Sequence, residues 1–207
     1  MQNDYDQIRL DDENEDDDQD KRNEQGAEAL MQKMMKTRTI LLSGEVNKAL
    51  AERVVRQLLL LEDAGDDPIR VFIDSPGGDA DAGYAIFDMM RFIKPDVHTI
   101  GMGLVASAGA LILLAAAKEC RYATPNSHYL IHQPLSGMRG VATDIEIHAK
   151  ELQKTRERIN KLISDETGQP LEKVEQDTDR DFWMSADEAK EYGLVSRIVS
   201  SRSELEG

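Results

Sequence analysis

Residues 69–110 read IRVFIDSPGGDADAGYAIFDMMRFIKPDVHTIGMGLVASAGA, and this stretch decides the fold class. The apolar run from Ile69 to Ile73 predicts a strand, and it enters a turn signal at Asp74 to Gly78. Apolar spacing from Ala80 to Ile93 predicts a helix, and Val97 to Gly101 predicts the next buried strand. A strand, a helix and a second strand in this order indicate a parallel pair joined by a right-handed crossover.

The alternation of helices and strands continues on both sides of this stretch. The pattern predicts helices at Ala27–Lys36, Asn47–Ala64, Ser107–Ala117 and Thr143–Thr167, and strands at Thr39–Ser43, Tyr129–Ile131 and Leu194–Val199. Two capping-box signals are present, Thr143 with Glu146 and Ser185 with Glu188, and Gly168 is expected to stop the long helix. We therefore expect an α/β fold with a mostly parallel sheet, formed by one domain over residues 26–207.

Acidic residues are concentrated at the start of the chain. Residues 1–25 hold eleven Asp or Glu and three Lys or Arg, within a chain of 207 residues and net charge −15. Such a segment buries too little apolar surface to offset the entropy of ordering, so a disordered tail is expected. Its charge repels nucleic acid and anionic membranes, and neither is expected as a partner.

Composition also bears on location and cofactors. Cys120 is the single cysteine and no basic segment precedes an apolar run at the N-terminus, so a reducing, cytoplasmic location is expected. The most apolar stretch, Leu104–Ala117, is shorter than the about 20 residues that a membrane helix needs. No phosphate-binding loop pattern occurs, so the chain itself is not expected to bind ATP.

One serine lies among small residues where a strand gives way to an apolar helix. Ser107 is flanked by Ala106, Ala108 and Gly109, and backbone N–H groups at a helix start can stabilise an oxyanion. An ordinary N-cap serine has the same local pattern, so this stretch alone leaves both interpretations open. The paired glycines at 77 and 78 likewise permit close approach to a ligand oxygen or a plain tight turn.

The histidines differ in their sequence surroundings. His132 follows an apolar strand, at a position where side chains commonly face a functional site. His128 lies four residues earlier, which along a strand is about 13 Å and too far to share one ion, so no metal site is expected. His98 and His148 lack polar company in the sequence and are expected to have packing or surface roles.

Three carboxylates precede the bulky residues Phe182, Trp183 and Met184. These residues are expected to shield one carboxylate from water, and a shielded carboxylate can hold an imidazole in one tautomer. A solvated turn is expected for Asp177 and Asp179, and composition alone does not choose among Asp177, Asp179 and Asp181.

Taken together, these motifs resemble the Clp protease proteolytic subunit (ClpP) family over about residues 30–199. The first half of the resemblance consists of DSPGG at 74–78, KPD at 94–96, GLVASAGA at 103–110, PNS at 125–127 and IHQPL at 131–135. The second half consists of ATDIEIHA at 142–149, TGQ at 167–169, EQDTDRD at 175–181 and MSADEAKEYGLV at 184–195. Order and spacing hold throughout, which makes the combined signal much more specific than any single motif.

The resemblance implies a serine endopeptidase that needs no cofactor. In the family pattern Ser107 is the nucleophile, His132 the general base and Asp181 the residue that orients the histidine. Backbone N–H groups of Gly78 and Ala108 match the oxyanion hole. The implied fold is crotonase-like, with the long helix protruding as a handle.

The resemblance also implies an assembly of two stacked heptameric rings that degrades unfolded proteins. An ATP-driven hexameric unfoldase would deliver the substrates, and Phe72 and Phe92 match part of its docking pocket. Asp179 and Arg180 match positions that pair between the rings.

The chain departs from the family pattern at several positions. Asparagine, an aromatic residue and methionine are usual where this chain has Asp74, Arg70 and Ala108. The acidic tail replaces an apolar N-terminal loop. Two alternative functions are a non-proteolytic crotonase-type enzyme, which needs no Ser-His-Asp set, and a non-catalytic ring subunit, which would lack part of that set. All three positions of the set are filled.

Overall fold

A computed structural model describes residues 29–205, and the chain divides after Arg38 into two units, residues 1–38 and 39–207. In the first unit residues 29–36 are helical, which confirms the described part of the helix expected at Ala27–Lys36. The acidic tail, residues 1–25, lies outside the described residues.

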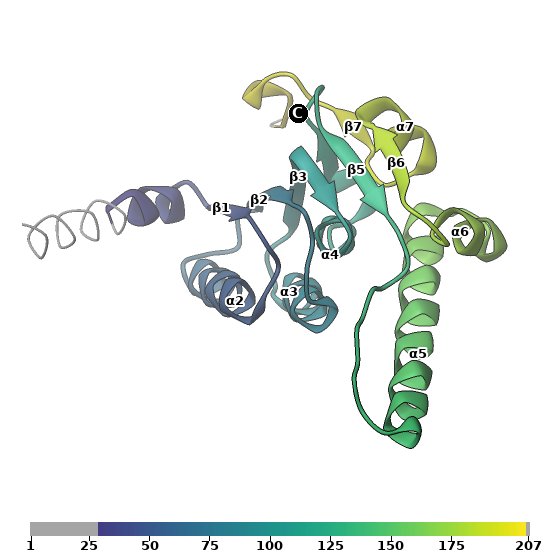
Figure 1. Ribbon diagram of the computed structural model, residues 1–207. Coiled ribbons are helices and arrows are strands. Elements are labelled where there is room, and N and C mark those ends of the chain that lie inside the picture. Colours follow the sequence, from purple (N-terminus) through teal and green to yellow (C-terminus); the bar gives the residue numbers. More distant parts are fainter. Residues whose placement is uncertain (1–28, 206–207) are drawn as a thin grey trace, which may run out of the picture. The chain divides into compact units, whose positions relative to one another are not determined.

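The second unit is built on a sheet that has seven strands within residues 39–205 (Figure 1). Five strands lie side by side and parallel, in the order β1 (Thr39–Ser43), β2 (Ile69–Ser75), β3 (Val97–Ala106), β4 (Arg121–Ala123) and β7 (Arg197–Ile198). Strand β5 (His128–Ile131) pairs parallel with the end of β3, and β6 (Phe182–Ser185) pairs antiparallel with β5. The expected α/β fold with a mostly parallel sheet is confirmed.

Three of the described helices lie against one face of this sheet (Figure 1): α2 (Lys48–Asp63), α3 (Ala80–Phe92) and α4 (Ala108–Leu113). Asn47 and Asp79 cap α2 and α3, because their side chains accept hydrogen bonds from the N–H groups of Leu50 and Ala82. Strand β2 alternates, with Ile69, Val71 and Ile73 fully buried and the residues between them half-buried. The alternation of buried and half-buried residues in β2 therefore corresponds to the face of the sheet that the helices cover.

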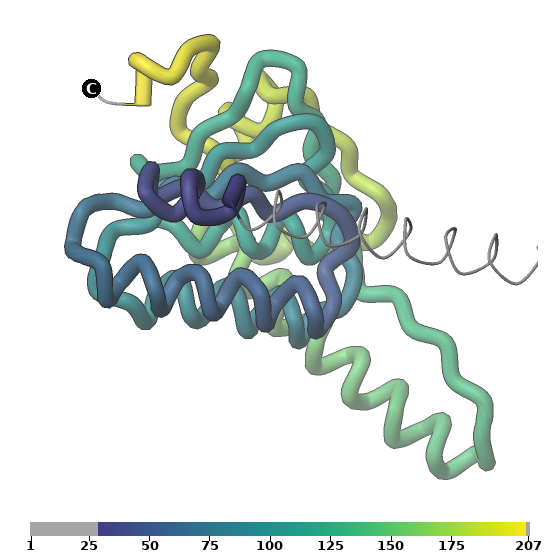
Figure 2. The backbone as a smooth tube through the Cα atoms, turned by 90° about the vertical axis from the view of Figure 1, so that its left-hand side faces the viewer, coloured from purple at the N-terminus to yellow at the C-terminus, as the bar shows by residue number. Residues whose placement is uncertain are grey.

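The long helix α5 (Ala142–Thr167) extends away from the sheet, and residues 132–141 run beside it (Figures 1 and 2). Its buried residues, Ile159, Asn160, Ile163 and Thr167, all lie in its C-terminal half. Gly168 ends it in the left-handed conformation, as the sequence predicted. The remaining elements are α6 (Leu171–Asp177), α7 (Ala186–Tyr192) and the 3-10 turns η1 (Lys118–Cys120) and η2 (Arg202–Leu205).

Three sequence-based expectations about elements were wrong. The helix expected at Ser107–Ala117 ends at Leu113, because the N–H of Ala115 bonds three residues back to Ile112 and the chain leaves the α-helical hydrogen-bond pattern. The long helix starts after Val141 without a side-chain cap, so Thr143 is not its N-cap. The last strand covers only Arg197–Ile198, because the N–H groups of Leu194 and Val195 bond back to Ala189. Elements β4, α6 and β6 were not predicted.

Candidate active site

The site begins where β3 changes its neighbour. Residues 99–101 of β3 pair with β4, whereas residues 104–106 pair with β5. Between them Gly103 has a φ of +55°, and Asp74 Oδ1 accepts a hydrogen bond from the N–H of Leu104 at 3.0 Å. A Cβ on Gly103 would lie 2.7 Å from Asp74 Oδ1 and displace the carboxylate, and the positive φ also favours glycine at this bend. The bend lets β3 continue past the position predicted for its end and deliver Ser107 beside β5.

Ser107 stands between β3 and α4 in a backbone conformation that serine seldom adopts. Its φ is +53° and its ψ is −119°, and its N–H donates to the carbonyl of Leu130 at 2.9 Å. Gly77 passes so closely that an added Cβ would lie 2.5 Å from the Cβ of Ser107. Strain of this kind persists where the surroundings enforce it, and it is concentrated at functional sites.

His132 and Asp181 are brought together by strand register. Strands β5 and β6 are antiparallel, and their last pair is Ile131 with Phe182. One step further along the same register His132 stands opposite Asp181. Their side chains meet, with His132 Nδ1 3.0 Å from Asp181 Oδ1. The carboxylate thus fixes the orientation of a ring that is 49 residues distant in sequence.

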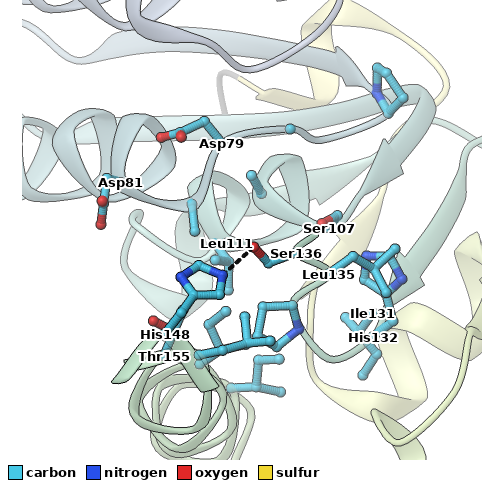
Figure 3. A pocket seen from close by; sticks show the side chains of 18 residues that line it. Asp79, Asp81, Ser107, Leu111, Ile131, His132, Leu135, Ser136, His148 and Thr155 are labelled. Carbon is cyan, nitrogen blue, oxygen red and sulfur yellow. Dashed lines mark hydrogen bonds between the residues drawn. The ribbon is translucent and has the colours of Figure 1, made fainter. Parts of the chain in front are cut away.

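Ser107 and His132 line one cavity of about 560 Å³ (Figure 3). Its apolar lining comes mainly from α4, β5 and α5, with Leu111, Ile131, Leu152, Ile159 and Ile163. Figure 3 shows Ser107 and His132 at one end of this pocket. Among residues 29–205 the Ser107 hydroxyl makes no hydrogen bond to His132, although both side chains line the pocket.

The backbone N–H groups of Gly78 and Ala108 have no acceptor among residues 29–205, and both residues line the cavity with Ser107. The φ of Gly78 is +146°, and an added Cβ would lie 2.3 Å from the carbonyl oxygen of Val46. Ala108 is the first residue of α4, where an N–H has no partner within the helix. The family resemblance implies these same two positions as oxyanion donors.

The expected shielding of Asp181 is wrong for this chain. The Asp181 side chain is 61 % exposed, and Trp183, expected to cover it, is 55 % exposed. The physical reason is that β6 lies at the edge of the sheet, so that only Met184 of its three bulky residues is buried.

The solvated turn expected for Asp177 is also wrong. Asp177 ends α6, and its Oδ2 accepts a hydrogen bond from the Tyr192 hydroxyl at 2.9 Å and pairs with Lys173 Nζ at 2.5 Å. Burial first, and then the Asp177 carboxylate, raise the pKa of the Tyr192 hydroxyl. Asp177 is therefore a packed residue whose hydrogen-bond partner, Tyr192, belongs to α7.

The remaining predicted site residues lie outside the pocket around Ser107. Asp179 is exposed and pairs through Oδ1 with Arg156 Nη2 at 3.0 Å, and Arg180 follows it on the surface. Phe92 is 80 % exposed. Phe72 is half-buried and packs against a small cluster formed by Ile100, Tyr122, Val199 and Leu205.

His148 has the polar partner that its sequence surroundings did not suggest. Its Nε2 lies 2.7 Å from the Ser136 hydroxyl, and both residues line the cavity (Figure 3). The contact arises because residues 132–141 run back along α5. No local sequence pattern predicts this path of the chain. His98 packs against the ring of Tyr122 as expected, and burial lowers its pKa.

Among residues 29–205 no group of three His, Cys, Asp or Glu side chains could hold a metal ion. The described helices also include none that is both long and apolar enough to cross a membrane.

Comparison with known proteins identifies the family of the chain. The Clp protease family matches residues 21–202. The ATP-dependent Clp protease proteolytic subunit 2 of Treponema denticola is 64 % identical over 179 residues, covering 86 % of this chain and 90 % of that protein. The subunit of the same name from Treponema pallidum is 62 % identical, covering 88 % of this chain and 92 % of that protein.

A solved structure of a ClpP1 mutant from Listeria monocytogenes superposes with a TM-score of 0.80 and is 53 % identical. The match covers 85 % of this chain and 99 % of that one. Since the family match spans nearly the whole chain and the relatives are this similar, the chain belongs to the Clp protease family and is a serine-type peptidase.

Proposed function

We propose that Ser107, His132 and Asp181 are the catalytic residues of this peptidase. The observation that carries the proposal is that Ser107 and His132 line one pocket while His132 Nδ1 bonds Asp181 at 3.0 Å. With Nδ1 donating to the carboxylate, Nε2 is left as the proton acceptor for the Ser107 hydroxyl. The Ser107–His132 hydrogen bond forms when substrate fills the cavity, since such bonds commonly tighten in the substrate complex.

The reaction follows from these positions. Ser107 Oγ attacks the scissile carbonyl carbon and its proton passes to His132 Nε2, while the carbonyl oxygen becomes an oxyanion. The N–H groups of Gly78 and Ala108 stabilise this charge. Because the donor at position 108 is the backbone N–H, alanine supplies it as well as a residue with a larger side chain. His132 then gives the proton to the leaving amine, and water releases the acyl group from Ser107 by the same route.

The second serine–histidine pair in the pocket, Ser136 with His148, is a weaker candidate. The other ring nitrogen of His148 meets no carboxylate among residues 29–205, and Ser136 lies on a segment without helix or strand. The pair therefore lacks the orienting acid that His132 has in Asp181.

The proposal extends to the assembly and its partners: two stacked heptameric rings served by an ATP-driven hexameric unfoldase that delivers unfolded proteins. Its support in this chain is unpartnered apolar surface. Large exposed apolar residues gather on α5 and the segment before it: Leu135, Met138, Val141, Ile145 and Ile147. Such a surface is typical of a protein–protein contact. We further propose Asp179 and Arg180 at the contact between rings, Phe72 and Phe92 at the unfoldase, and a cytoplasmic location.

The test of the proposed residues is the Ser107→Ala variant. It should lose short-peptide hydrolysis by about 10⁴-fold or more, because the nucleophile is gone, while elution as an assembly is unchanged. A fluorophosphonate probe should label Ser107 in the wild-type protein and leave Ser136 unmodified, as read by mass spectrometry of the digested adduct. Labelling of Ser136, or activity retained by Ser107→Ala, would contradict the assignment.

A further inference from the structure

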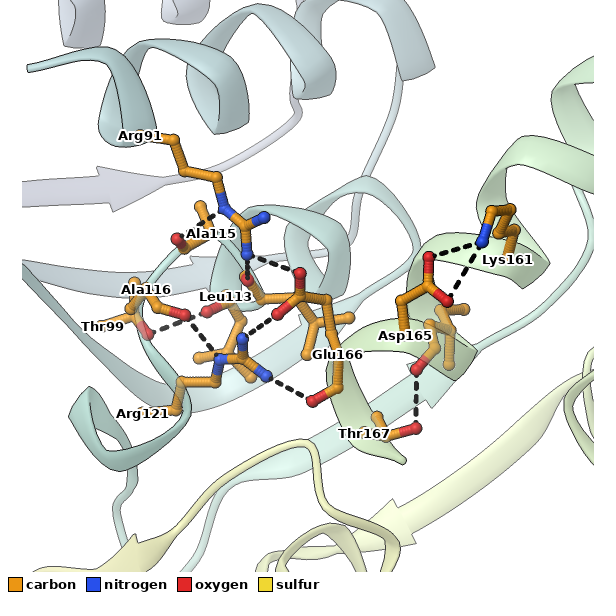
Figure 4. A network of polar contacts seen from close by, with 12 residues as sticks. Arg91, Thr99, Leu113, Ala115, Ala116, Arg121, Lys161, Asp165, Glu166 and Thr167 are labelled. Atoms are coloured by element: carbon orange, nitrogen blue, oxygen red, sulfur yellow. Dashed lines mark hydrogen bonds and ion pairs between the residues drawn. The ribbon is translucent and has the colours of Figure 1, made fainter. Parts of the chain in front are cut away.

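The helix that begins after Ser107 ends in a row of buried carbonyl groups. The carbonyls of residues 113–116 each accept a hydrogen bond from a side chain of another element (Figure 4). These bonds are Thr99 Oγ1 to Leu113 at 2.9 Å, Arg91 Nη2 to Leu114 at 3.1 Å, Arg91 Nε to Ala115 at 3.1 Å and Arg121 Nε to Ala116 at 2.8 Å. Buried carbonyls need such partners, so the end of α4 is fixed in place by α3, β3 and β4.

One carboxylate joins the two arginines. Glu166 Oε1 lies 2.6 Å from Arg91 Nη2, and Glu166 Oε2 pairs with Arg121 Nη2 (Figure 4). Arg121 Nη1 also donates to the Glu166 carbonyl at 3.0 Å. The Arg121 side chain is only 1 % exposed, and burial lowers its pKa, an effect that the Glu166 carboxylate opposes. A charge buried this far depends on its partner.

Glu166 lies on the last turn of α5, the helix that forms a wall of the cavity. Residues His148, Leu152, Thr155, Ile159 and Ile163 of that helix line the same pocket as Ser107. The two arginines connect Glu166 to the end of α4. This helix has six residues and is about 9 Å long, and all six residues are buried. A short helix packed on every side moves as a unit, so a shift at its end reaches Ser107 at its start.

We propose that Glu166 is a positioning residue for peptide hydrolysis: it clamps Arg91 and Arg121 against the end of α4 and so sets Ser107 relative to the pocket wall formed by α5. The inference rests on the proposed role of Ser107 as nucleophile. Glu166 itself touches neither substrate nor the reacting atoms, and it acts through the two arginines and the carbonyls of residues 114–116.

The experiment compares Glu166→Gln with a matched control, Asp165→Asn, in the full chain. Asp165 is the adjacent residue of α5, and it pairs with Lys161 at 2.9 Å on the exposed side of the helix (Figure 4). The measured quantities are kcat and KM for a short fluorogenic peptide, per subunit of the isolated assembly. The rate of fluorophosphonate labelling at Ser107 is measured beside them, well below the thermal midpoint of each variant.

Glu166→Gln should lower kcat and the labelling rate together, by about 10- to 100-fold, with a much smaller change in KM. A residue with a merely structural role would lower the thermal midpoint and leave both rates per assembled subunit unchanged. Asp165→Asn should match the wild-type protein in all four quantities. An assembled Glu166→Gln protein with wild-type kcat and labelling rate would overturn the proposal.

A milder variant covers the case in which Glu166→Gln does not assemble. Arg91→Lys keeps the charge at a partly exposed position, but one ammonium group cannot replace the fork that bonds two carbonyls and a carboxylate. It should show the same joint loss of kcat and labelling rate, and wild-type values in an assembled protein would overturn the proposal. Absence of labelling at Ser107 in the wild-type protein would instead reject the catalytic assignment on which the inference rests.

Discussion

Asp177 and Asp181 lie four residues apart and have different partners. Asp181 contacts His132 from an exposed position, whereas Asp177 is 16 % exposed and is held by Tyr192 and Lys173. Composition offers no way to choose between them, and the solvent exposure of the two side chains in the structure is the reverse of the expected one. The choice of Asp181 came from the family pattern, and the observed contact with His132 Nδ1 supports it.

The two carboxylates should therefore respond differently to the same substitution. Asp181→Asn should lower kcat by about 10³-fold or more, because an amide favours the wrong tautomer of His132. Asp177→Asn should keep kcat per folded subunit and lower the free energy of unfolding by about 1 kcal/mol, through weaker bonds to Tyr192 and Lys173. Steady-state kinetics and urea denaturation measure the two effects. A large loss of kcat in both variants would show that the segment acts as a unit.

At the scale of elements, two capping-box signals with the same spacing lead to different helix starts. Ser185 and Glu188 form a capping box at α7, with the Ser185 side chain bonded to the N–H of Glu188 and the Glu188 side chain bonded to the N–H of Ser185. Thr143 and Glu146 show the same spacing, yet α5 begins after Val141 and has no side-chain cap. The start of α5 is determined by where residues 132–141 bring the chain, and that is not a local property.

This difference gives a paired prediction for helix stability. Ser185→Ala should lower the free energy of unfolding by about 1 kcal/mol, since it removes an N-cap hydrogen bond. Thr143→Ala should change it by less than about 0.5 kcal/mol, because Thr143 is an exposed residue inside the helix. Urea denaturation at one subunit concentration is the measurement. Equal losses in the two variants would mean that Thr143 caps α5 in solution.

At the scale of the whole molecule, charged residues are distributed unevenly along the chain. Residues 1–25 carry eleven acidic and three basic side chains, and the family match starts only at residue 21. We propose that this acidic tail is separate from the peptidase domain and acts on substrates through its field. Where several subunits assemble, their tails would add their charge, which favours basic over acidic substrate segments.

Deletion of residues 2–25 should leave short-peptide hydrolysis unchanged and abolish a preference for basic over acidic unstructured polypeptides. In the full chain that preference should fall with salt, because the Debye length shrinks from about 10 Å at 0.1 M to about 3 Å at 1 M. A tail of equal length with Asn and Gln in place of Asp and Glu separates charge from length. A preference that persists in the neutral tail, or at every salt concentration, would contradict the electrostatic role.

The sequence by itself determined the order of β1, α2, β2, α3 and β3, and the capping box of α7. These features arise from contacts within a few residues, so apolar spacing and turn residues report them directly. The quoted motifs also identified the residues at the pocket, since a family pattern preserves chemistry at fixed positions along the chain.

Only the tertiary structure decided how those residues meet. The register of β5 with β6 brings His132 to Asp181, the bend at Gly103 delivers Ser107, and Glu166 joins Arg91 to Arg121 across three elements. Short elements such as β6 were missed for the same reason: four residues at a sheet edge gain their stability from a partner strand distant in sequence. The local sequence pattern predicts which segments form helices and strands. Pairing between segments that are remote in sequence decides which polar side chains contact one another.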